Sequence, residues 1–238
     1  MPKLSIITCA YNEIGSIETV LARIAAVDLG PGWEKEVLVV DNCSTDGTRE
    51  FLQHFEHPNF RILLNPRNLG KGGSIRRAIG ALTGDYAVIQ DADLEYHPNQ
   101  LPKLLRKVEA GAVVVLGSRV LGGDPQYEYA YAYLGVRLLT GWTNLLYGAQ
   151  LTDVGTAIKL VRTDILRSLN LVGNSFDLDF ELVDKVLLAG HPIDEVALDY
   201  IPRTYAEGKK IKAWDGIKAM WVILRDRLGL SALYKASR

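Results

Sequence analysis

Short apolar runs alternate with helical patterns over the first 120 residues, and this alternation constrains the fold more than any other feature. The runs are rich in β-branched residues and bounded by turn residues, as buried strands are, and they cover residues 4–9, 36–40, 60–64, 86–90 and 113–117. Helical patterns lie between them over residues 17–24, over 48–55 behind the capping residue Asp46, after Gly73, and from Pro98 to near Gly111. Strands that alternate with helices form a mostly parallel sheet covered on both faces. The sequence therefore predicts an α/β, doubly wound fold.

The second half of the chain has a different character. Residues 127–147 are aromatic and weakly charged, and the pattern predicts strands over 157–161 and 193–201 with a helix over 176–189 between them. We expect these elements to complete the sheet and to wall a cleft.

The C-terminal region is basic and amphipathic. Residues 203–238 contain nine basic and three acidic residues, against 18 and 25 in the rest of the chain. Five apolar residues recur there at spacings of three and four: Ile217, Met220, Trp221, Leu224 and Leu228. This pattern predicts an amphipathic helix. Its apolar stripe either packs on the protein core or lies at the headgroup boundary of an anionic membrane, and the sequence leaves both open.

The overall composition excludes several classes of protein. A net charge of −1 lacks the basic excess of a nucleic-acid-binding protein, so we expect no such partner. The longest uncharged stretch, residues 138–152, is shorter than the ~20 residues of a membrane-spanning helix. Two cysteines are too few for a disulfide framework, and the first residues lack the regions of a signal peptide. We therefore expect a cytoplasmic protein.

Polar residues follow each predicted strand of the first half, at the edge where doubly wound sheets bind ligands. These polar segments are residues 11–13, 41–47, 65–73, 91–95 and 118–119. Asp91 and Asp93 are the most informative, because two carboxylates two residues apart at a strand end can bind one hard cation, and Glu95 adds a third. The remaining ligands of a divalent ion are often phosphate oxygens, which predicts a diphosphate partner.

A glycine-rich segment, residues 68–73, leads into a helix that carries Arg76 and Arg77. We predict that free backbone N–H groups at this helix start, together with Lys71, face an anion. The glycine spacing is neither that of a P-loop nor that of a dinucleotide-binding fingerprint. Neither an ATPase nor a nicotinamide-dependent enzyme is therefore indicated.

Four motifs in chain order resemble the signature of family 2 glycosyltransferases of the GT-A fold: residues 5–13, 39–48, 68–72 and 91–93. Further motifs are similar to polyprenyl-phosphate (dolichol-phosphate) mannosyl- and glucosyltransferases: residues 117–119, 152–156, 176–179 and 203–210. The resemblance covers roughly residues 4–220. It implies a GT-A domain over 1–210, with a nucleotide-sugar half at 1–120 and an acceptor half at 121–210, followed by a basic amphipathic helix at 211–238.

The resemblance also implies roles for individual residues. The nucleoside would be held by Ala10, Tyr11, Glu13 and Asp41. Mg²⁺ or Mn²⁺ would be bound with the donor diphosphate by Asp91, Asp93 and Glu95, beside Ala92 and Lys71. The phosphate charge would be met by Arg119, Arg203 and Lys209. Catalysis would then depend on Asp91, Asp93, Arg119 and Arg203.

This sequence departs from the family pattern at two places. Cys9 replaces the proline that usually precedes Ala10, and Asn42 and Cys43 replace the usual second Asp and Gly after Asp41. These positions lie near the expected base contacts. Whether the donor carries uracil or guanine therefore stays open.

A phosphate acceptor places a different demand on the site than an alcohol does. A phosphate monoester, with its second pKa near ~6, is largely dianionic at pH 7 and can attack without a general base. Cations must then offset its repulsion from the donor diphosphate. The candidate cations are Arg119, Arg203, Lys209 and Arg137. The residues predicted at the acceptor phosphate itself are Arg119, Arg137 and Asp153. If the acceptor is a hydroxyl, the possible bases are Asp153, Asp177 and Asp179.

Together with the residue patterns, the resemblance implies an inverting, metal-dependent hexosyltransferase. It would move mannose or glucose from a GDP- or UDP-sugar to a polyprenyl or dolichyl phosphate, while bound peripherally to the inner face of the cell membrane. One alternative is a related family 2 transferase acting on a hydroxyl acceptor such as a polysaccharide. Another is a nucleotide-sugar-binding module without turnover, against which the intact Asp91, Asp93 and Arg119 argue.

Overall fold

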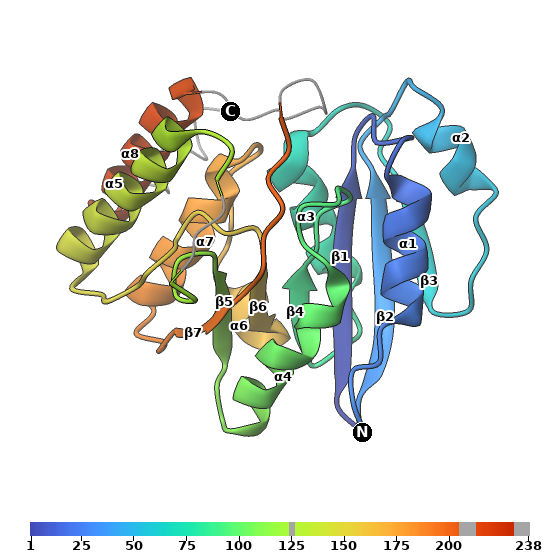
Figure 1. The fold of residues 1–238 in the computed structure, drawn as a ribbon, viewed down its shortest axis with the longest axis horizontal. Coiled ribbons are helices and arrows are strands. Elements are labelled where there is room, and N and C mark those ends of the chain that lie inside the picture. Colours follow the sequence, from blue (N-terminus) through green and yellow to red (C-terminus); the bar gives the residue numbers. More distant parts are fainter. Residues whose placement is uncertain (124–126, 205–212, 231–238) are drawn as a thin grey trace.

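The computed structural model describes residues 1–123, 127–204 and 213–230. Its strands are β1 (Lys3–Ala10), β2 (Glu34–Asp41), β3 (Phe60–Leu64), β4 (Tyr86–Ile89), β5 (Val114–Ser118), β6 (Lys159–Arg162) and β7 (Asp194–Ala197). They form one sheet in the order β3-β2-β1-β4-β6-β5-β7 (Figure 1). Only β6 runs against its neighbours, antiparallel to both β4 and β5. The mostly parallel α/β sheet predicted from the sequence is confirmed.

Helices connect the strands and cover both faces of the sheet. They are α1 (Ile17–Ala26), α2 (Thr48–Gln53), α3 (Gly70–Ala81), the 3-10 turn η1 (Pro98–Gln100), α4 (Leu101–Glu109), α5 (Ala130–Tyr147), α6 (Thr163–Ser168), α7 (Asp177–Leu188) and α8 (Ala213–Arg227). Among the described helices, none is both long and apolar enough to cross a membrane.

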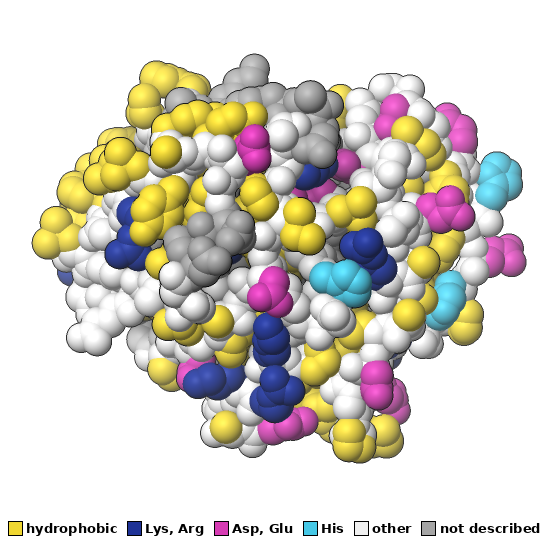
Figure 2. Space-filling model, viewed as in Figure 1, with side chains coloured by type: hydrophobic (Ala, Val, Ile, Leu, Met, Phe, Trp, Pro, Cys, Tyr) yellow, Lys and Arg dark blue, Asp and Glu magenta, His cyan; other side chains and the backbone are white. Residues whose placement is uncertain are grey.

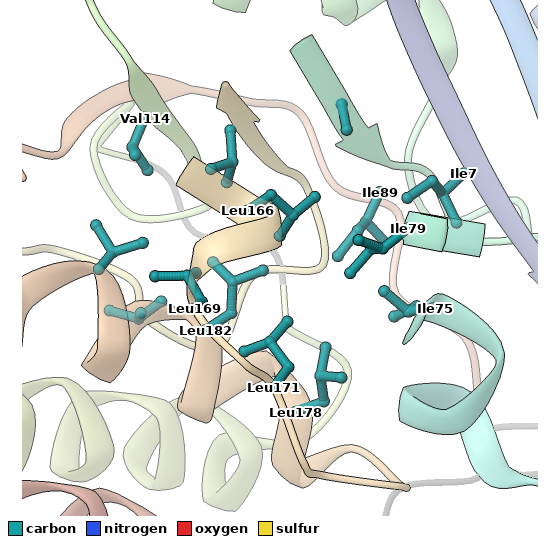
Figure 3. Packing of buried hydrophobic residues seen from close by; sticks show 14 of the residues in the cluster. Ile7, Ile75, Ile79, Ile89, Val114, Leu166, Leu169, Leu171, Leu178 and Leu182 are labelled. Carbon is teal, nitrogen blue, oxygen red and sulfur yellow. The ribbon is translucent and has the colours of Figure 1, made fainter. Parts of the chain in front are cut away.

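Alternate residues of each central strand enter two separate hydrophobic clusters. On β1, Ile6 packs in a cluster with residues of α1 and α4, whereas Ile7 packs with residues of α3, α6 and α7. Figure 3 shows the second cluster, in which Ile75 and Ile79 of α3 lie near Ile7. Because successive side chains of a strand point to opposite faces, a continuous apolar strand requires helices on both sides. This is why the central strands read as unbroken apolar runs.

Several elements differ from the prediction. Helix α3 begins at Gly70, not after Gly73, and the short helix α6 lacks a sequence signal that we recognised. Strand β7 covers Asp194–Ala197 and not the whole of 193–201, because the chain leaves the sheet there. The N–H of Ile201 then donates to the carbonyl of Glu95 at 2.9 Å, which draws the chain across to the end of β4.

Helix α8 lies beside α5 at one end of the molecule and also packs on α7 (Figure 1). Ala219, Val222 and Ile223 form its buried face. The apolar stripe predicted from the sequence lies on the other side, where Ile217 and Trp221 are 55% and 54% exposed. The stripe therefore faces solvent and not the protein core.

Candidate active site

The loops that follow β1 and β2 are bound to each other at the carboxyl edge of the sheet. Asn12 Oδ1 accepts from the N–H of Thr45 at 2.8 Å, and the N–H of Glu13 donates to Thr48 Oγ1 at 2.9 Å. Asn12 has a positive φ of 53°, which asparagine tolerates better than most residues. The geometry places Glu13 and the partly exposed Tyr11 at the edge where Asp41 ends β2.

Asp41 is fully buried, and its carboxylate organises the loop after β2. It accepts hydrogen bonds from the N–H groups of Cys43 and Ser44, each at 3.1 Å, and pairs with the guanidinium of Arg49 at 2.7 Å. The carbonyl of Ala10, itself buried at the end of β1, accepts from the N–H of Asn42 at 2.8 Å. Two residues expected at the nucleoside, Ala10 and Asp41, therefore shape the loop around that position.

Asn42, one of the departures from the family pattern, has a structural role. Its Oδ1 accepts from the N–H of Leu69 at 2.8 Å and from Asn65 Nδ2 at 3.0 Å, while its Nδ2 donates to Asn68 Oδ1 at 2.9 Å. An aspartate at this position would lack the Nδ2 donor. The asparagine thus ties the loop after β2 to the loop before α3.

The sequence predicted an anion cradle at the start of α3, and the chain itself uses three of the backbone N–H groups there. Leu69 and Gly70 donate to the side chains of Asn42 and Asn68 at 2.8 and 2.9 Å, and Gly73 donates to the carbonyl of Asn174 at 3.3 Å. A Cβ built on Gly70 would lie 1.9 Å from the same Asn174 oxygen. The glycines serve close packing of α3 against residues 173–175.

Lys71, in the first turn of α3, links two carboxylates. Its ammonium lies 2.9 Å from Asp91 Oδ1 and 3.2 Å from Asp179 Oδ2. Burial alone would lower the pKa of Lys71, but the charges of Asp179 and Asp91 outweigh burial and raise it. Lys71 is therefore held as a cation directly beside the first aspartate of the predicted metal motif.

Asp179 has a second cationic partner that the sequence analysis missed. Lys159, at the start of β6, is almost fully buried, and its Nζ lies 3.3 Å from Asp179 Oδ1 and donates to the carbonyl of Thr156. Burial lowers the pKa of Lys159. A lone charged residue within the apolar segment 157–161 was the available signal for this buried ion pair.

Arg203 contacts three carboxylates that come from two loops, those after β1 and β4. Its Nη2 lies 2.7 Å from Asp93 Oδ2, its Nη1 lies 3.3 Å from Glu13 Oε2, and its Nε lies 3.8 Å from Glu95 Oε1. The backbone N–H of Arg203 also donates to Glu95 Oε1 at 3.0 Å. Burial, with the nearby charges of Asp91 and Glu95, raises the pKa of Asp93 to about 7 despite Arg203. Ala92, between the two aspartates, is buried and accepts from Ser16 Oγ through its carbonyl.

The carboxylates of the predicted metal motif are engaged in ion pairs. In the described part of the chain, no three acidic, histidine or cysteine side chains converge as a ready-made metal site. The donor chemistry nevertheless suits a hard divalent cation, because Asp91, Asp93 and Glu95 offer only oxygen atoms at one strand end. The residues therefore fit Mg²⁺ or Mn²⁺ in kind, while Lys71 and Arg203 hold them in this structure.

Arg119, at the end of β5, is clamped by Asp153. Its Nε and Nη2 lie 2.7 and 2.8 Å from the two oxygens of Asp153, and its backbone N–H donates to the same carboxylate at 3.1 Å. The rings of Tyr127 and Tyr200 lie on the guanidinium, each with its centroid 5.2 Å from Cζ. Such stacking adds to a bidentate pair and fixes the plane of the guanidinium. Tyr200 is a second residue that the sequence analysis missed.

The segment of residues 152–153 also brings Arg137 to this region. Arg137 is exposed on α5, and its Nη1 donates to the carbonyl of Thr152 at 3.3 Å. The carboxylate of Glu195, on β7, holds the same segment, because it accepts hydrogen bonds from the N–H groups of Thr152 and Asp153 at 2.9 and 3.1 Å. The structure thus brings together the three residues expected at the acceptor phosphate.

The candidate bases are poorly suited to accept a proton. Burial alone would raise the pKa of Asp153, but the charge and hydrogen bonds of Arg119 lower it. The pKa of Asp179 is lowered against burial by Lys159 and Lys71. Asp177, in the first turn of α7, accepts from the N–H of Ser175 at 2.7 Å.

Lys209, expected at the phosphates, lies outside the described residues.

The chain has a GT-A fold, which it shares with solved structures. Glucosyl-3-phosphoglycerate synthase from Mycobacterium tuberculosis, solved with Mn²⁺, UDP and glucosyl-3-phosphoglycerate, superposes with a TM-score of 0.71 at 21% identity, covering 96% of this chain and 80% of that one. S. aureus TarS, solved with UDP-GlcNAc, superposes with a TM-score of 0.62 at 19% identity, covering 94% and 66%. At these identities the similarity establishes the fold alone.

The sequence establishes the family. The model of glycosyl transferase family 2 matches residues 5–169, and the chain belongs to this family. It is 31% identical to undecaprenyl-phosphate mannosyltransferase of Micrococcus luteus, covering 92% of this chain and 96% of the relative. It is 27% identical to undecaprenyl-phosphate 4-deoxy-4-formamido-L-arabinose transferase of Edwardsiella ictaluri, covering 70% of this chain and about half, 51%, of the relative.

Proposed function

We propose that this protein is an inverting, metal-dependent hexosyltransferase that moves mannose or glucose from a nucleotide diphosphate sugar to a polyprenyl phosphate. One observation supports the proposal most strongly: four carboxylates and two cations form ion pairs at the sheet edge where doubly wound folds bind ligands. Lys71 pairs with Asp91, and Arg203 pairs with Asp93, Glu95 and Glu13. The M. luteus relative, similar over almost its whole length, is named for undecaprenyl phosphate and mannose.

On the donor side, the residues have separate tasks. Tyr11, Glu13 and Asp41 border the position of the nucleoside. Asp91, Asp93 and Glu95 hold Mg²⁺ or Mn²⁺, which when bound stabilises the negative charge of the leaving diphosphate. M. tuberculosis glucosyl-3-phosphoglycerate synthase, which shares the fold, was solved with Mn²⁺ and UDP. Arg203, with Lys209, supplies positive charge for the phosphates.

The transfer step on this proposal is one in-line displacement. An oxygen of the acceptor phosphate forms a bond to the anomeric carbon, the bond from that carbon to the diphosphate oxygen breaks, and its electron pair leaves with the nucleoside diphosphate. Configuration at the anomeric carbon is therefore inverted. The anionic nucleophile carries no proton to remove, which agrees with the lowered pKa values of Asp153 and Asp179.

On the acceptor side, Arg119 and Arg137 are the cations nearest residues 152–153. Arg119 is held rigid by Asp153 and two tyrosine rings, so it offers a fixed charge with little loss of side-chain entropy on binding. Arg137 is exposed and sits on α5. We place the acceptor phosphate between them, which favours a phosphate over the hydroxyl acceptor of a polysaccharide.

An exposed apolar surface on α5 and α8 supports peripheral membrane contact. The α5/α8 face consists of Tyr131, Leu134, Leu138, Leu145, Trp214, Ile217, Met220, Trp221 and Leu228, all at least two-fifths exposed. Figure 2 shows hydrophobic side chains gathered at this end of the molecule. Exposed Arg137, Lys218 and Arg227 on the same helices add positive charge. We propose that this face lies on the inner surface of the cell membrane, where the polyprenyl chain is embedded.

Product analysis tests this function. The purified chain is incubated with GDP-mannose, UDP-glucose and related donors, each with a short prenyl phosphate, a prenyl alcohol or an oligosaccharide, in Mg²⁺ or Mn²⁺. We expect a prenyl-phosphate sugar of inverted anomeric configuration and no product from the alcohol. A glycosidic product on the oligosaccharide would favour the hydroxyl-acceptor alternative. Nucleotide-sugar binding without product from any acceptor would favour the non-catalytic module.

A further inference from the structure

Arg203 occupies the space between the carboxylates that the proposed function assigns to the metal. Its guanidinium is 2.7 Å from Asp93 Oδ2 and also reaches Glu13 and Glu95, which come from different loops. Only 18% of its side chain is exposed. A guanidinium commonly meets one carboxylate through two parallel hydrogen bonds. Here it is shared among three carboxylates, as a central cation is.

The backbone holds Arg203 in this position. The N–H of Ile201 donates to the Glu95 carbonyl at 2.9 Å, and the N–H of Arg203 donates to Glu95 Oε1 at 3.0 Å. The segment that follows β7 is therefore docked along the loop that contains Asp93 and Glu95. Moving the Arg203 side chain away from Asp93 requires no change in this backbone pairing.

A divalent cation and the guanidinium compete for the same oxygens. Mg²⁺ and Ca²⁺ bind oxygen ligands at about 2.0–2.6 Å and require several of them on one point. The Asp93 oxygen already contacts Arg203 at 2.7 Å, and no three described acidic side chains converge on a common point. Binding of the ion to Asp93 Oδ2 and Glu95 Oε1, the two oxygens that Arg203 contacts, therefore requires Arg203 to leave.

We propose that Arg203 is an internal placeholder for the metal. Its guanidinium balances the charge of Asp93, Glu95 and Glu13 before the metal binds, and the metal displaces it from Asp93. The displaced guanidinium then faces the diphosphate that accompanies the ion. Metal and diphosphate therefore bind cooperatively, because the metal releases the Arg203 guanidinium and the diphosphate then binds it. Each ligand raises the affinity of the protein for the other by the same factor. This inference rests on the metal assignment of the proposed function.

A titration with Mn²⁺ tests whether Arg203 is a placeholder for the metal. The full chain is titrated without nucleotide, and the EPR signal of free Mn²⁺ reports binding. Arg203→Gln should bind Mn²⁺ at least about fivefold more tightly than the wild type, because the competing cation is gone. Adding UDP or GDP should tighten Mn²⁺ binding in the wild type by a larger factor than in Arg203→Gln. The matched control is Arg106→Gln, an exposed arginine on α4, which should match the wild type.

A second measurement separates displacement from a simple change of charge. Arg203→Lys keeps the charge but cannot reach three carboxylates at once, so it should also bind Mn²⁺ more tightly than the wild type. In a ¹⁵N-arginine-labelled protein, the Nε–H signal that Arg203→Lys removes should shift when Mg²⁺ saturates the wild type. Equal Mn²⁺ affinities in wild type and Arg203→Gln, or an unmoved Nε–H signal, would overturn the inference. Failure of the wild type to bind Mn²⁺ even with nucleotide would instead overturn the metal assignment.

Discussion

The proposed donor side and the proposed acceptor side of the sheet edge differ in how their charged and apolar side chains are arranged. At the ends of β2 and β4, the carboxylates of Asp41, Asp91 and Asp93 each pair with a basic side chain. At the end of β5, one buried clamp joins Arg119 to Asp153, and beyond it α5 and α8 expose the nine apolar residues of the α5/α8 face. The first arrangement suits a compact, charged ligand, and the second suits a ligand with a phosphate and a long apolar chain.

The largest effect is expected on the donor side. Asp93→Ala should lower the transfer rate by at least roughly 10³-fold, which corresponds to about 4 kcal/mol of transition-state stabilisation. The loss arises because the ion that offsets charge on the leaving diphosphate loses a ligand. Initial rates at saturating donor and acceptor, with and without chelator, measure it.

The control for this variant is Asp199→Ala, an exposed carboxylate paired with Lys103, which should retain full activity. Circular dichroism should show that Asp93→Ala is folded, since Asp93 is buried but belongs to neither hydrophobic cluster. Full activity of Asp93→Ala in metal-free buffer would remove the metal from the mechanism.

The next effect concerns stability on the acceptor side. Arg119→Ala leaves Asp153 buried without its ionic partner, and such a loss costs about 3–5 kcal/mol of unfolding free energy. Urea unfolding measures this value. The double variant Arg119→Met, Asp153→Leu removes both charges and should recover most of the stability while remaining inactive. If the double variant is active, Arg119 is a structural residue and the acceptor phosphate lies elsewhere.

The sequence predicted the fold of the first half well, because each strand is a local apolar run buried on both faces. Strand β3 was predicted to the residue, and β4 and β5 to within one residue at each end. The start of α3 was misplaced because the glycine-rich segment 68–73 was interpreted as preceding the helix, whereas the helix begins at Gly70. The role of the glycines depends on Asn174, about 100 residues away, which no local pattern contains.

The residues of the site were easier to predict than their partners. Strand ends place Asp91, Asp93 and Glu13 at one edge, so their proximity follows from the topology. The pairing of Lys71 with Asp179 depends on how α7 packs against α3. Likewise, the arrival of Arg203 at Asp93 depends on the path of the chain after β7. These contacts are set by tertiary packing and have no short-range sequence signal.

The α5/α8 face gives the third prediction. Each large apolar side chain buried in the headgroup region contributes about 1.5–3 kcal/mol, so the double variant Ile217→Glu, Trp221→Glu should bind anionic liposomes at least about tenfold more weakly than the wild type. Because both side chains are more than half exposed, the variant should keep the stability of the wild type. Cosedimentation with anionic and neutral liposomes measures the binding.

A matched control separates this face from general surface hydrophobicity. Leu188→Glu changes an exposed leucine at the end of α7 and should leave liposome binding unchanged. Wild-type binding should weaken as ionic strength rises, since part of it is electrostatic. No binding of the wild type to anionic liposomes at low salt would exclude the membrane role of the α5/α8 face.

The smallest effect concerns Asp184 on α7, which differs from Asp41, Asp91 and Asp93 because no cation among the described residues is bonded to it. Neither of its oxygens has a hydrogen-bond partner among the described residues. Burial, with the charges of Asp226 and Glu181 and against that of Arg225, raises its pKa to about 8. Tyr147 of α5 also faces this region, and burial together with Asp184 raises its pKa.

The sign of the resulting pH dependence follows from proton binding. Between the unfolded pKa near ~3.9 and the folded pKa of about 8, the folded chain holds a proton on Asp184 that the unfolded chain has lost. This residue therefore makes the protein less stable as pH rises through that window, by at most about 1.4 kcal/mol per pH unit. Asp184→Asn should remove that slope and become the more stable protein near pH 8.

Urea unfolding from pH 5 to 9 measures the difference, with Glu18→Gln on the exposed side of α1 as control. If the unfolding free energies of Asp184→Asn and the wild type depend on pH in the same way, Asp184 is ionised in the folded protein. A cation would then pair with Asp184, as cations pair with Asp41, Asp91 and Asp93.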